Sequence, residues 1–355
     1  VRTIIESGYE IHIARESAAN HSNIHNLLRE SSEIKNALFM VLLIPAIALG
    51  WLMSGSFVFV ALLIWIYIWS ACSGMKSALR GIGRMRSIAA VESRWSFALY
   101  AINFLLLFWL PNLLLIFAAF ALAEFFKAVD YHKKLSGWAE IPSLYRLYQI
   151  KFSIFSKIKS NLAKLRAQFR LVAVNFLSVL HYRAPMIMLG LVSTSAAIGL
   201  YSAGLRFLTA LRLIPGASLN VLLPEFSTAG SSRRDLRSGM LFAVITGLVV
   251  SAGLWSGADF IMSITFDFGE AVPVLRVLAW TFLPVSVNHI CEAWLLSGRR
   301  ESGVNRALAS TSALILISAA ISIPLGGAIA AAWCALGGET ALMLIYFVMI
   351  SKIKN

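Results

Sequence analysis

Three arginines inside apolar stretches of the sequence are the residues best suited to do chemistry. Arg183, Arg206 and Arg212 lie among long runs of aliphatic and aromatic residues. A guanidinium near the centre of a bilayer is costly, so it usually faces protein, water or an anionic ligand. It also stays charged and offers a bidentate fork to phosphate oxygens. The sequence therefore predicts either an anion-binding site or a set of buried ion pairs.

Helical geometry limits how these arginines combine. At a rise of about 1.5 Å per residue, Arg183 and Arg206 lie at similar depths in two consecutive, antiparallel helices. Arg212 lies about two turns further along the second helix and about 120° around it, so Arg206 and Arg212 cannot point at one spot. The carboxylates available for ion pairs are Glu339, near the middle of its apolar run, and Glu124 and Glu292, nearer the ends of theirs.

The composition shows which elements must hold these residues. Of the 355 residues 59% are hydrophobic and only 14% are charged, far from the composition of a soluble domain. Because a helix needs about 20 apolar residues to cross a bilayer, the sequence predicts an all-α polytopic membrane protein of about ten transmembrane helices in two bundles. The ten predicted spans are 37–54, 56–74, 96–110, 112–129, 171–193, 196–223, 238–258, 272–296, 304–323 and 326–350.

The charges are distributed on one side of these spans. Of 31 Lys and Arg residues, four are assigned to the interior of spans, namely the three arginines above and Arg276, and the other 27, including Lys127 and Arg306 at span ends, fall on one side. The positive-inside rule then predicts that both termini are cytoplasmic. No segment is long and polar enough to be a nucleic-acid-binding domain. The three cysteines lie in apolar runs without metal-ligand spacing, so neither a metal site nor a disulfide is expected.

The spans and loops suggest four regions. Residues 1–36 form a predicted cytoplasmic amphipathic segment, 37–129 a lobe of four spans, 130–170 a basic bridge, and 171–355 a lobe of six spans. Apolar residues at helical spacing alternate with lysines and arginines in the bridge, which predicts a helix lying on anionic phospholipids of the cytoplasmic leaflet. A solvated linker helix packed on the ends of the spans is the alternative.

One stretch has a recognisable pattern. Residues 181–227 contain an arginine-bearing helix, a short turn, then Gly199, Tyr201 and Ala203, and finally Ile214–Pro215 and Leu222–Pro224. This pattern resembles the first hairpin of the C-terminal lobe in polysaccharide and oligosaccharide-lipid exporters of the MOP superfamily, the Wzx-like repeat-unit flippases. Further similarity lies in Ser73, Gly74, Leu79, Arg80, Gly81, Gly83, Arg84, Val274, Leu275, Leu278 and Ala279.

The resemblance implies two lobes of six helices, whereas only four spans are predicted before the bridge. Ser7, Gly8 and Tyr9, followed by Ala14, Arg15 and Glu16, are similar to the cytoplasmic end of the second family helix. Residues 1–36 are therefore expected to be the remnant of that helix and its following loop. The first helical hairpin is expected to be missing, which leaves the N-terminal lobe incomplete.

The resemblance also implies a function. Family members move a polyprenyl-pyrophosphate-linked oligosaccharide across the bacterial inner membrane by alternating access, for O-antigen, lipopolysaccharide or exopolysaccharide biosynthesis. Arg183, Arg206 and Arg212 would bind the pyrophosphate, and Arg80 and Arg84 would attract the headgroup at entry. Glu339, Glu124 and His181 are the candidates for coupling to an ion gradient, because coupling needs a titratable group that changes exposure.

The remaining implications concern partners and alternatives. Other polysaccharide assembly proteins are expected partners, and no cofactor or metal is implied. An enzyme of the same pathways is disfavoured, because the longest predicted outer connection, 257–271, has only about 15 residues for chemistry. A MATE-like drug exporter of the same superfamily and a truncated, inactive copy are the alternative functions.

Overall fold

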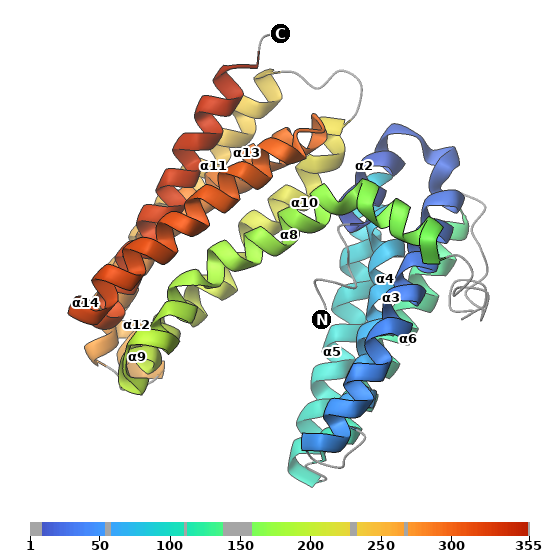
Figure 1. Cartoon of the computed structure of the whole chain (residues 1–355), viewed down its shortest axis with the longest axis horizontal. Coiled ribbons are helices and arrows are strands. Elements are labelled where there is room, and N and C mark those ends of the chain that lie inside the picture. The colour runs from blue at the N-terminus through green and yellow to red at the C-terminus, as the bar shows by residue number, and fades with distance from the viewer. Residues whose placement is uncertain are drawn as a thin grey trace. The chain divides into compact units, whose positions relative to one another are not determined.

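Helices make up every regular element of the described chain. The computed structural model describes residues 9–53, 58–109, 112–137, 158–227, 233–265 and 269–353, and no strand occurs in these ranges. The helices are grouped in two units, Val1–Val172 and Ala173–Asn355 (Figure 1). The prediction of an all-α protein is confirmed.

The first unit contains five α-helices and one short 3₁₀-helix in its described part. They are α2 (Tyr9–Ala19), η1 (His21–Asn23), α3 (Ile24–Met53), α4 (Val58–Gly81), α5 (Met85–Trp109) and α6 (Leu113–Ser136). Helix α4 packs against α2, α3 and α6, and α5 packs on α6. Ile13, Leu28, Met75, Leu79 and Tyr131 are buried together in its core.

The first unit also contains the start of the long helix α8 (Ile158–Val192), which continues from Ala173 into the second unit. The remaining elements of the second unit are α9 (Ser195–Leu211), α10 (Leu213–Ser227), α11 (Arg233–Ser256), α12 (Ala258–Thr265), η3 (Gly269–Ala271), α13 (Val272–Ser297) and α14 (Glu301–Ser351). Helix α13 is central, because α9, α10, α11 and α14 all pack against it (Figure 1). A buried core that includes Tyr201, Leu278, Phe282 and Ile315 joins α9, α13 and α14.

Six segments of the described chain are long and apolar enough to cross a membrane. They are Ala61–Gly81, Phe169–Val192, Ser195–Ser227, Arg233–Ser256, Gly269–Ser297 and Glu301–Ser351. The last has 51 residues, and Gly327 interrupts it with a positive φ of 54°, so it matches the two predicted spans 304–323 and 326–350. The predicted spans 37–54, 96–110 and 112–129 fall on α3, α5 and α6, which are not among the six. In α6 the apolar run is interrupted by Glu124, Lys127 and Asp130.

Two helices extend further than the predicted regions. Helix α3 begins at Ile24, so residues 24–36 continue directly into the first predicted span. Helix α8 begins at Ile158, so the second half of the predicted bridge and the next span form one continuous helix. The first half of the bridge, from residue 138 to 157, lies outside the described residues. The boundaries of the four predicted regions stay predictions.

Local sequence explains where the helices of the second unit begin and bend. The Thr194 side chain accepts a hydrogen bond from the Ala197 backbone N–H at 3.3 Å and caps α9. Helices α9 and α10 follow one another with Arg212 between them. Pro215 has no N–H to donate to the carbonyl of Leu211, one turn back, which explains a break at this point. The break places Arg212 at the junction of two helices.

Small residues bring the helices close together around the same region. A side chain at Gly247 of α11 would approach the Leu283 Cα of α13 to 2.9 Å. A side chain at Gly338 would overlap with Ile315 of the other half of α14. Glycine at position 247 therefore lets α11 approach α13, and glycine at position 338, next to Glu339, lets the two halves of α14 approach each other.

A charged pocket in the second unit

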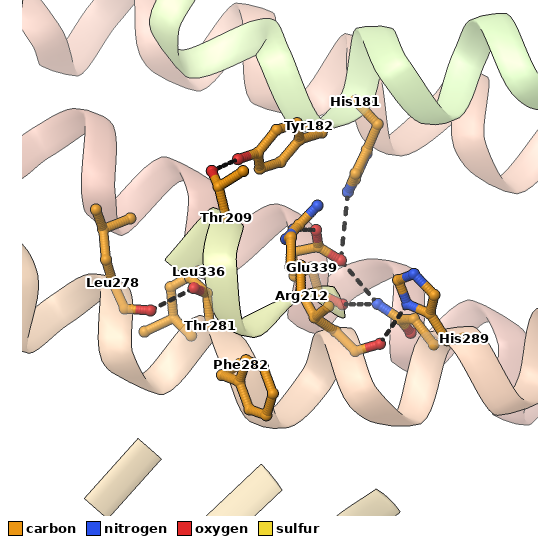
Figure 2. Close-up of polar contacts among 12 residues, drawn as sticks. His181, Tyr182, Thr209, Arg212, Leu278, Thr281, Phe282, His289, Leu336 and Glu339 are labelled. Carbon is orange, nitrogen blue, oxygen red and sulfur yellow. Dashed lines mark hydrogen bonds and ion pairs between the residues drawn. The ribbon is translucent and has the colours of Figure 1, made fainter. Parts of the chain in front are cut away.

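A buried carboxylate at the centre of the second unit is contacted from three other helices. Glu339 of α14 accepts a hydrogen bond from Nη2 of Arg212 at 2.5 Å and one from Nδ2 of Asn288, on α13, at 2.9 Å. The Nε2 atom of His181, on α8, lies 3.8 Å from the same carboxylate. Figure 2 shows the side chains of Arg212 and His181 directed toward Glu339. The side chains of Glu339 and Arg212 are only 10% and 18% exposed, so water screens their ion pair weakly.

His181 is held in place on its other side. Its Nδ1 atom lies 3.1 Å from the Thr311 hydroxyl, and the Thr311 hydroxyl also donates to the Ala307 carbonyl at 2.9 Å. The direction of the hydrogen bond between Nδ1 and Thr311 depends on the tautomer of His181. With its proton on Nε2, the ring N–H faces the Glu339 carboxylate.

Tyr182 forms a platform for two arginines. The guanidinium carbon of Arg212 lies 4.0 Å from the centroid of the Tyr182 ring, and that of Arg183 lies 5.2 Å from it. The two guanidinium carbons are therefore no more than about 9 Å apart. The Tyr182 hydroxyl is hydrogen-bonded to the hydroxyl of Thr209, which fixes the ring (Figure 2). Such contacts stabilise a cation by about 0.5–2 kcal/mol.

These side chains line a small pocket. It is bounded by His181, Tyr182, Pro185, Tyr201, Leu205, Leu208, Arg212, Thr281, Ile315, Ala335 and Glu339. Its walls are mostly apolar, and a few polar groups converge in it, which is the usual composition of a ligand site. The Nε atom of Arg212 is buried and makes no hydrogen bond within the described chain. Arg212 therefore keeps a donor for a further acceptor.

The predicted arginines are only partly brought together. Arg183 and Arg212 meet at Tyr182, but only Arg212 lines the pocket, and Arg183 and Arg206 are both exposed. The separation of Arg206 from Arg212 agrees with their helical phases. Arg276 at the end of the unit forms an ion pair with Asp259 at 2.6 Å.

The coupling candidates are divided between the two units. Glu339 and His181 contact each other, but Glu124 lies in the first unit, where its carboxylate is 3.0 Å from Nζ of Lys127.

The two arginines predicted to attract the lipid headgroup, Arg80 and Arg84, differ in exposure. Arg84 is exposed, whereas Arg80 is buried within its unit, which disfavours a surface role for Arg80.

Glu124 belongs to a second charged cluster. Lys127 also contacts Glu92 at 3.1 Å, and Glu92 contacts Lys76 at 2.7 Å. Burial opposes ionisation of Glu92, but the two lysines outweigh it and lower the pKa of Glu92 from 4.5 to about 2. The Tyr131 hydroxyl donates to the same carboxylate at 3.0 Å. Each charge in this cluster contacts an opposite one.

Sequence reasoning missed three residues in and around the pocket: Tyr182, Asn288 and Thr311. Asn288 carried a usable signal, because a polar amide within the apolar run 272–297 must find a hydrogen-bond partner when buried. Tyr182 and Thr311 gave no signal beyond being polar residues in an apolar run. Among the described residues, no cluster of three or more His, Cys, Asp or Glu side chains could hold a metal ion.

Comparison with known proteins finds similarity in structure only. No protein-family model matches the sequence, and no curated protein matches it significantly. The structure is similar to an outward-facing multidrug resistance MATE family transporter of the MOP superfamily, with a TM-score of 0.76 and 13% identity over 98% of this chain and 82% of the other. A single-residue mutant of the Vibrio cholerae MATE transporter VcmN gives a TM-score of 0.77 and 13% identity over 99% and 86%.

A flippase has the same architecture. The lipid II flippase MurJ, in an inward closed conformation, gives a TM-score of 0.62 and 12% identity over 99% of this chain and 81% of that protein. At such identities the similarity describes the fold. The chain therefore has the helical membrane-transporter fold that MATE transporters share with MurJ.

Proposed function

We propose that this protein is a transporter that moves a polyprenyl-pyrophosphate-linked oligosaccharide from the cytoplasmic to the outer leaflet of a bacterial inner membrane, by alternating access. In this proposal it is not an enzyme, and it serves the assembly of a surface polysaccharide together with other assembly proteins. Both termini face the cytoplasm.

The observation that carries the proposal is the excess of positive charge around the pocket of the second unit. Arg183 and Arg212 share the Tyr182 ring, and the carboxylate in contact with Arg212 is Glu339 alone among the described residues. A pyrophosphate group presents oxygens in several directions, so it can accept hydrogen bonds from two guanidinium groups on either side of it. Arg212 supplies its unused Nε donor, and Arg183 supplies an exposed guanidinium.

The fold agrees with this chemistry. One structural neighbour is named for flipping lipid II, so the same architecture can move a lipid across a bilayer in that protein. Apolar side chains such as Phe97, Phe104 and Phe108 are exposed along α5 of the first unit, as expected of helices in contact with lipid. In the proposal, Arg84 attracts the anionic headgroup before it reaches the pocket.

The test measures how the lipid-linked oligosaccharide is distributed between the cytoplasmic and outer leaflets in the bacterium that produces it. A sugar-specific probe that cannot cross the membrane is applied to cells with the gene, without it, and with Arg212→Gln at normal abundance. We expect intermediates to accumulate on the cytoplasmic side without the gene, and to be released by the wild type but not by Arg212→Gln. Unchanged sidedness in a strain without another flippase would contradict the proposal.

A MATE-like drug exporter is the second candidate, because MATE transporters have the same fold, with TM-scores of 0.76 and 0.77 for two of them. An exporter of cationic drugs needs carboxylates to bind its substrates, whereas the one carboxylate lining this pocket is already neutralised by Arg212. The two functions are separated by drug susceptibility. A deletion strain that becomes sensitive to cationic drugs while glycan sidedness stays normal would favour the drug exporter.

A further inference from the structure

The guanidinium of Arg212 already binds one anionic group, the carboxylate of Glu339. Its Nη2 donates to Glu339 at 2.5 Å, and the pair is largely buried. The Nε of Arg212 makes no hydrogen bond within the described residues, but a phosphate group that takes parallel hydrogen bonds from Nε and Nη2 must share Nη2 with Glu339, and the two anions repel each other there. The substrate and Glu339 therefore compete for one guanidinium.

Glu339 is surrounded by groups from every helix packed against it. Arg212 reaches it from the junction of α9 and α10, and Asn288 from α13. The titratable groups that face it or act on it electrostatically are His181 and Tyr182 of α8, Tyr201 of α9, His289 and Glu292 of α13, and Tyr346 of α14 itself. Of these, Glu292 is the second carboxyl group that interacts electrostatically with Glu339.

Displacement of Glu339 leaves a charge without its main partner. An ionised carboxylate buried in an apolar site is costly when its cation is removed. Asn288 still donates one hydrogen bond, and the Nε2 atom of His181 lies at 3.8 Å. These contacts do not replace a guanidinium, so uptake of a proton by the carboxylate relieves the cost.

We propose that Glu339 is a proton-binding site linked to the anion site at Arg212, such that the proton and an anionic phosphate ligand bind together. The inference rests on the proposed function, and it adds that proton binding to Glu339 favours binding of the anionic ligand. One proton from water adds to the Glu339 carboxylate, the ion pair with Arg212 breaks, and a phosphate oxygen takes the place of the carboxylate. When the ligand leaves, Glu339 loses the proton and pairs with Arg212 again, which neutralises the empty site.

At this site a proton favours ligand binding. At a site where a proton and a cationic substrate compete for one carboxylate, the proton opposes ligand binding. Reciprocity requires that the ligand raise the proton affinity of Glu339 by the same factor as the proton raises the ligand affinity. The coupling is therefore measurable as the pH dependence of binding, without any transport assay.

The experiment measures the dissociation constant of farnesyl pyrophosphate for the full chain in lipid nanodiscs, between about pH 5.5 and pH 8. For the wild type we expect affinity to rise as the pH falls, by up to about tenfold per pH unit. Glu339→Gln should bind tightly at all these values and lose that dependence. The phosphates of the probe titrate identically with both proteins, so the difference between the two curves isolates Glu339.

Three further variants make the result specific. Glu124→Gln removes a buried carboxylate of the first unit and should keep the wild-type dependence. Asn288→Ala removes a hydrogen bond to ionised Glu339, so the pH range over which ligand affinity changes should shift to higher pH. This variant tests the proposal if Glu339→Gln does not fold. His181→Gln should keep the dependence.

The outcomes separate this inference from the proposed function. Binding by the wild type that is lost in Arg212→Gln but has the same pH dependence in Glu339→Gln would overturn the proton linkage and leave the function standing. Loss of the dependence in His181→Gln, with Glu339→Gln unchanged, would assign the proton to His181 and overturn the inference. Failure of the wild type to bind the probe at every pH would contradict the proposed function itself.

Discussion

The two units each bury a cluster of charged side chains, and the clusters differ in their balance. In the first unit two lysines, Lys76 and Lys127, contact two carboxylates, Glu92 and Glu124. In the second unit Glu339 is paired with Arg212, with His181 beside it, and Arg183 shares the Tyr182 ring with Arg212. A balanced cluster holds helices together, whereas a cluster with surplus positive charge also keeps capacity for an anionic ligand.

The largest expected effect tests the balanced cluster. Lys127→Ala leaves the buried carboxylate of Glu124 without its cation and leaves Glu92 with Lys76 alone, and removal of one partner from such a network costs on the order of 3–5 kcal/mol of unfolding free energy. Thermal unfolding of the purified protein measures the loss. Lys134→Ala, an exposed position on the same helix, is the matched control and should change stability by less than about 0.5 kcal/mol. Equal stability of both variants would show that the first cluster is not structural.

The corresponding change in the second unit should affect ligand binding more than stability. Arg212→Gln removes the guanidinium from the pocket and should weaken binding of farnesyl pyrophosphate by about 10- to 100-fold. This factor corresponds to the typical free energy of a hydrogen bond to a charged group. The unfolding free energy of Arg212→Gln should fall less than that of Lys127→Ala, because Arg212 contacts one carboxylate whereas Lys127 contacts two. Isothermal titration and thermal unfolding of the same preparation give both numbers. A variant that unfolds readily but binds normally would make Arg212 a purely structural residue.

The pH dependence of stability should come partly from the first unit. The pKa of Glu92 is lowered from 4.5 to about 2 by Lys76 and Lys127. Its ion pairs therefore stabilise the fold fully above about pH 4.5, and this stabilisation is lost as the pH falls toward 2. Since Glu92 is partly exposed, we expect a contribution of about 1–2 kcal/mol. As the pH is lowered from 6 to 3, the unfolding temperature should fall less steeply for Glu92→Gln than for the wild type. Parallel curves for the two proteins would refute the assignment of this pH dependence to Glu92.

The smallest expected effect concerns the Tyr182 platform. Tyr182→Phe keeps the ring under Arg212 and Arg183 and loses only the hydrogen bond to Thr209, so ligand affinity should fall by about twofold or less. Tyr182→Ala removes the ring and should lower affinity by about five- to tenfold. Binding measurements on the two variants check this order. Equal losses would mean that the hydroxyl, and not the ring, positions the arginines.

The sequence predicts the helices well and the pocket poorly, for physical reasons. The apolar periods of the ten stretches are local signals, and within the described residues all ten fall on helices. The pairing of Arg212 with Glu339 joins residues 127 positions apart, so no local pattern specifies it. Helical phase does separate Arg206 from Arg212, as observed, but it cannot say which of them finds the carboxylate. Pro215 contributes by breaking the helix beside Arg212, and the consequence of that break depends on tertiary packing.

The central claim is that the surplus charge of the second unit serves an anionic lipid, and reconstituted translocation tests it most directly. A fluorescent polyprenyl-pyrophosphate oligosaccharide is placed in proteoliposomes, and a membrane-impermeant quencher reports how much of it remains in the outer leaflet. We predict that wild-type protein moves the lipid between leaflets, that Lys134→Ala does so equally, and that the double variant Arg183→Gln, Arg212→Gln does not. Equal translocation by the double variant, correctly folded, would contradict the account.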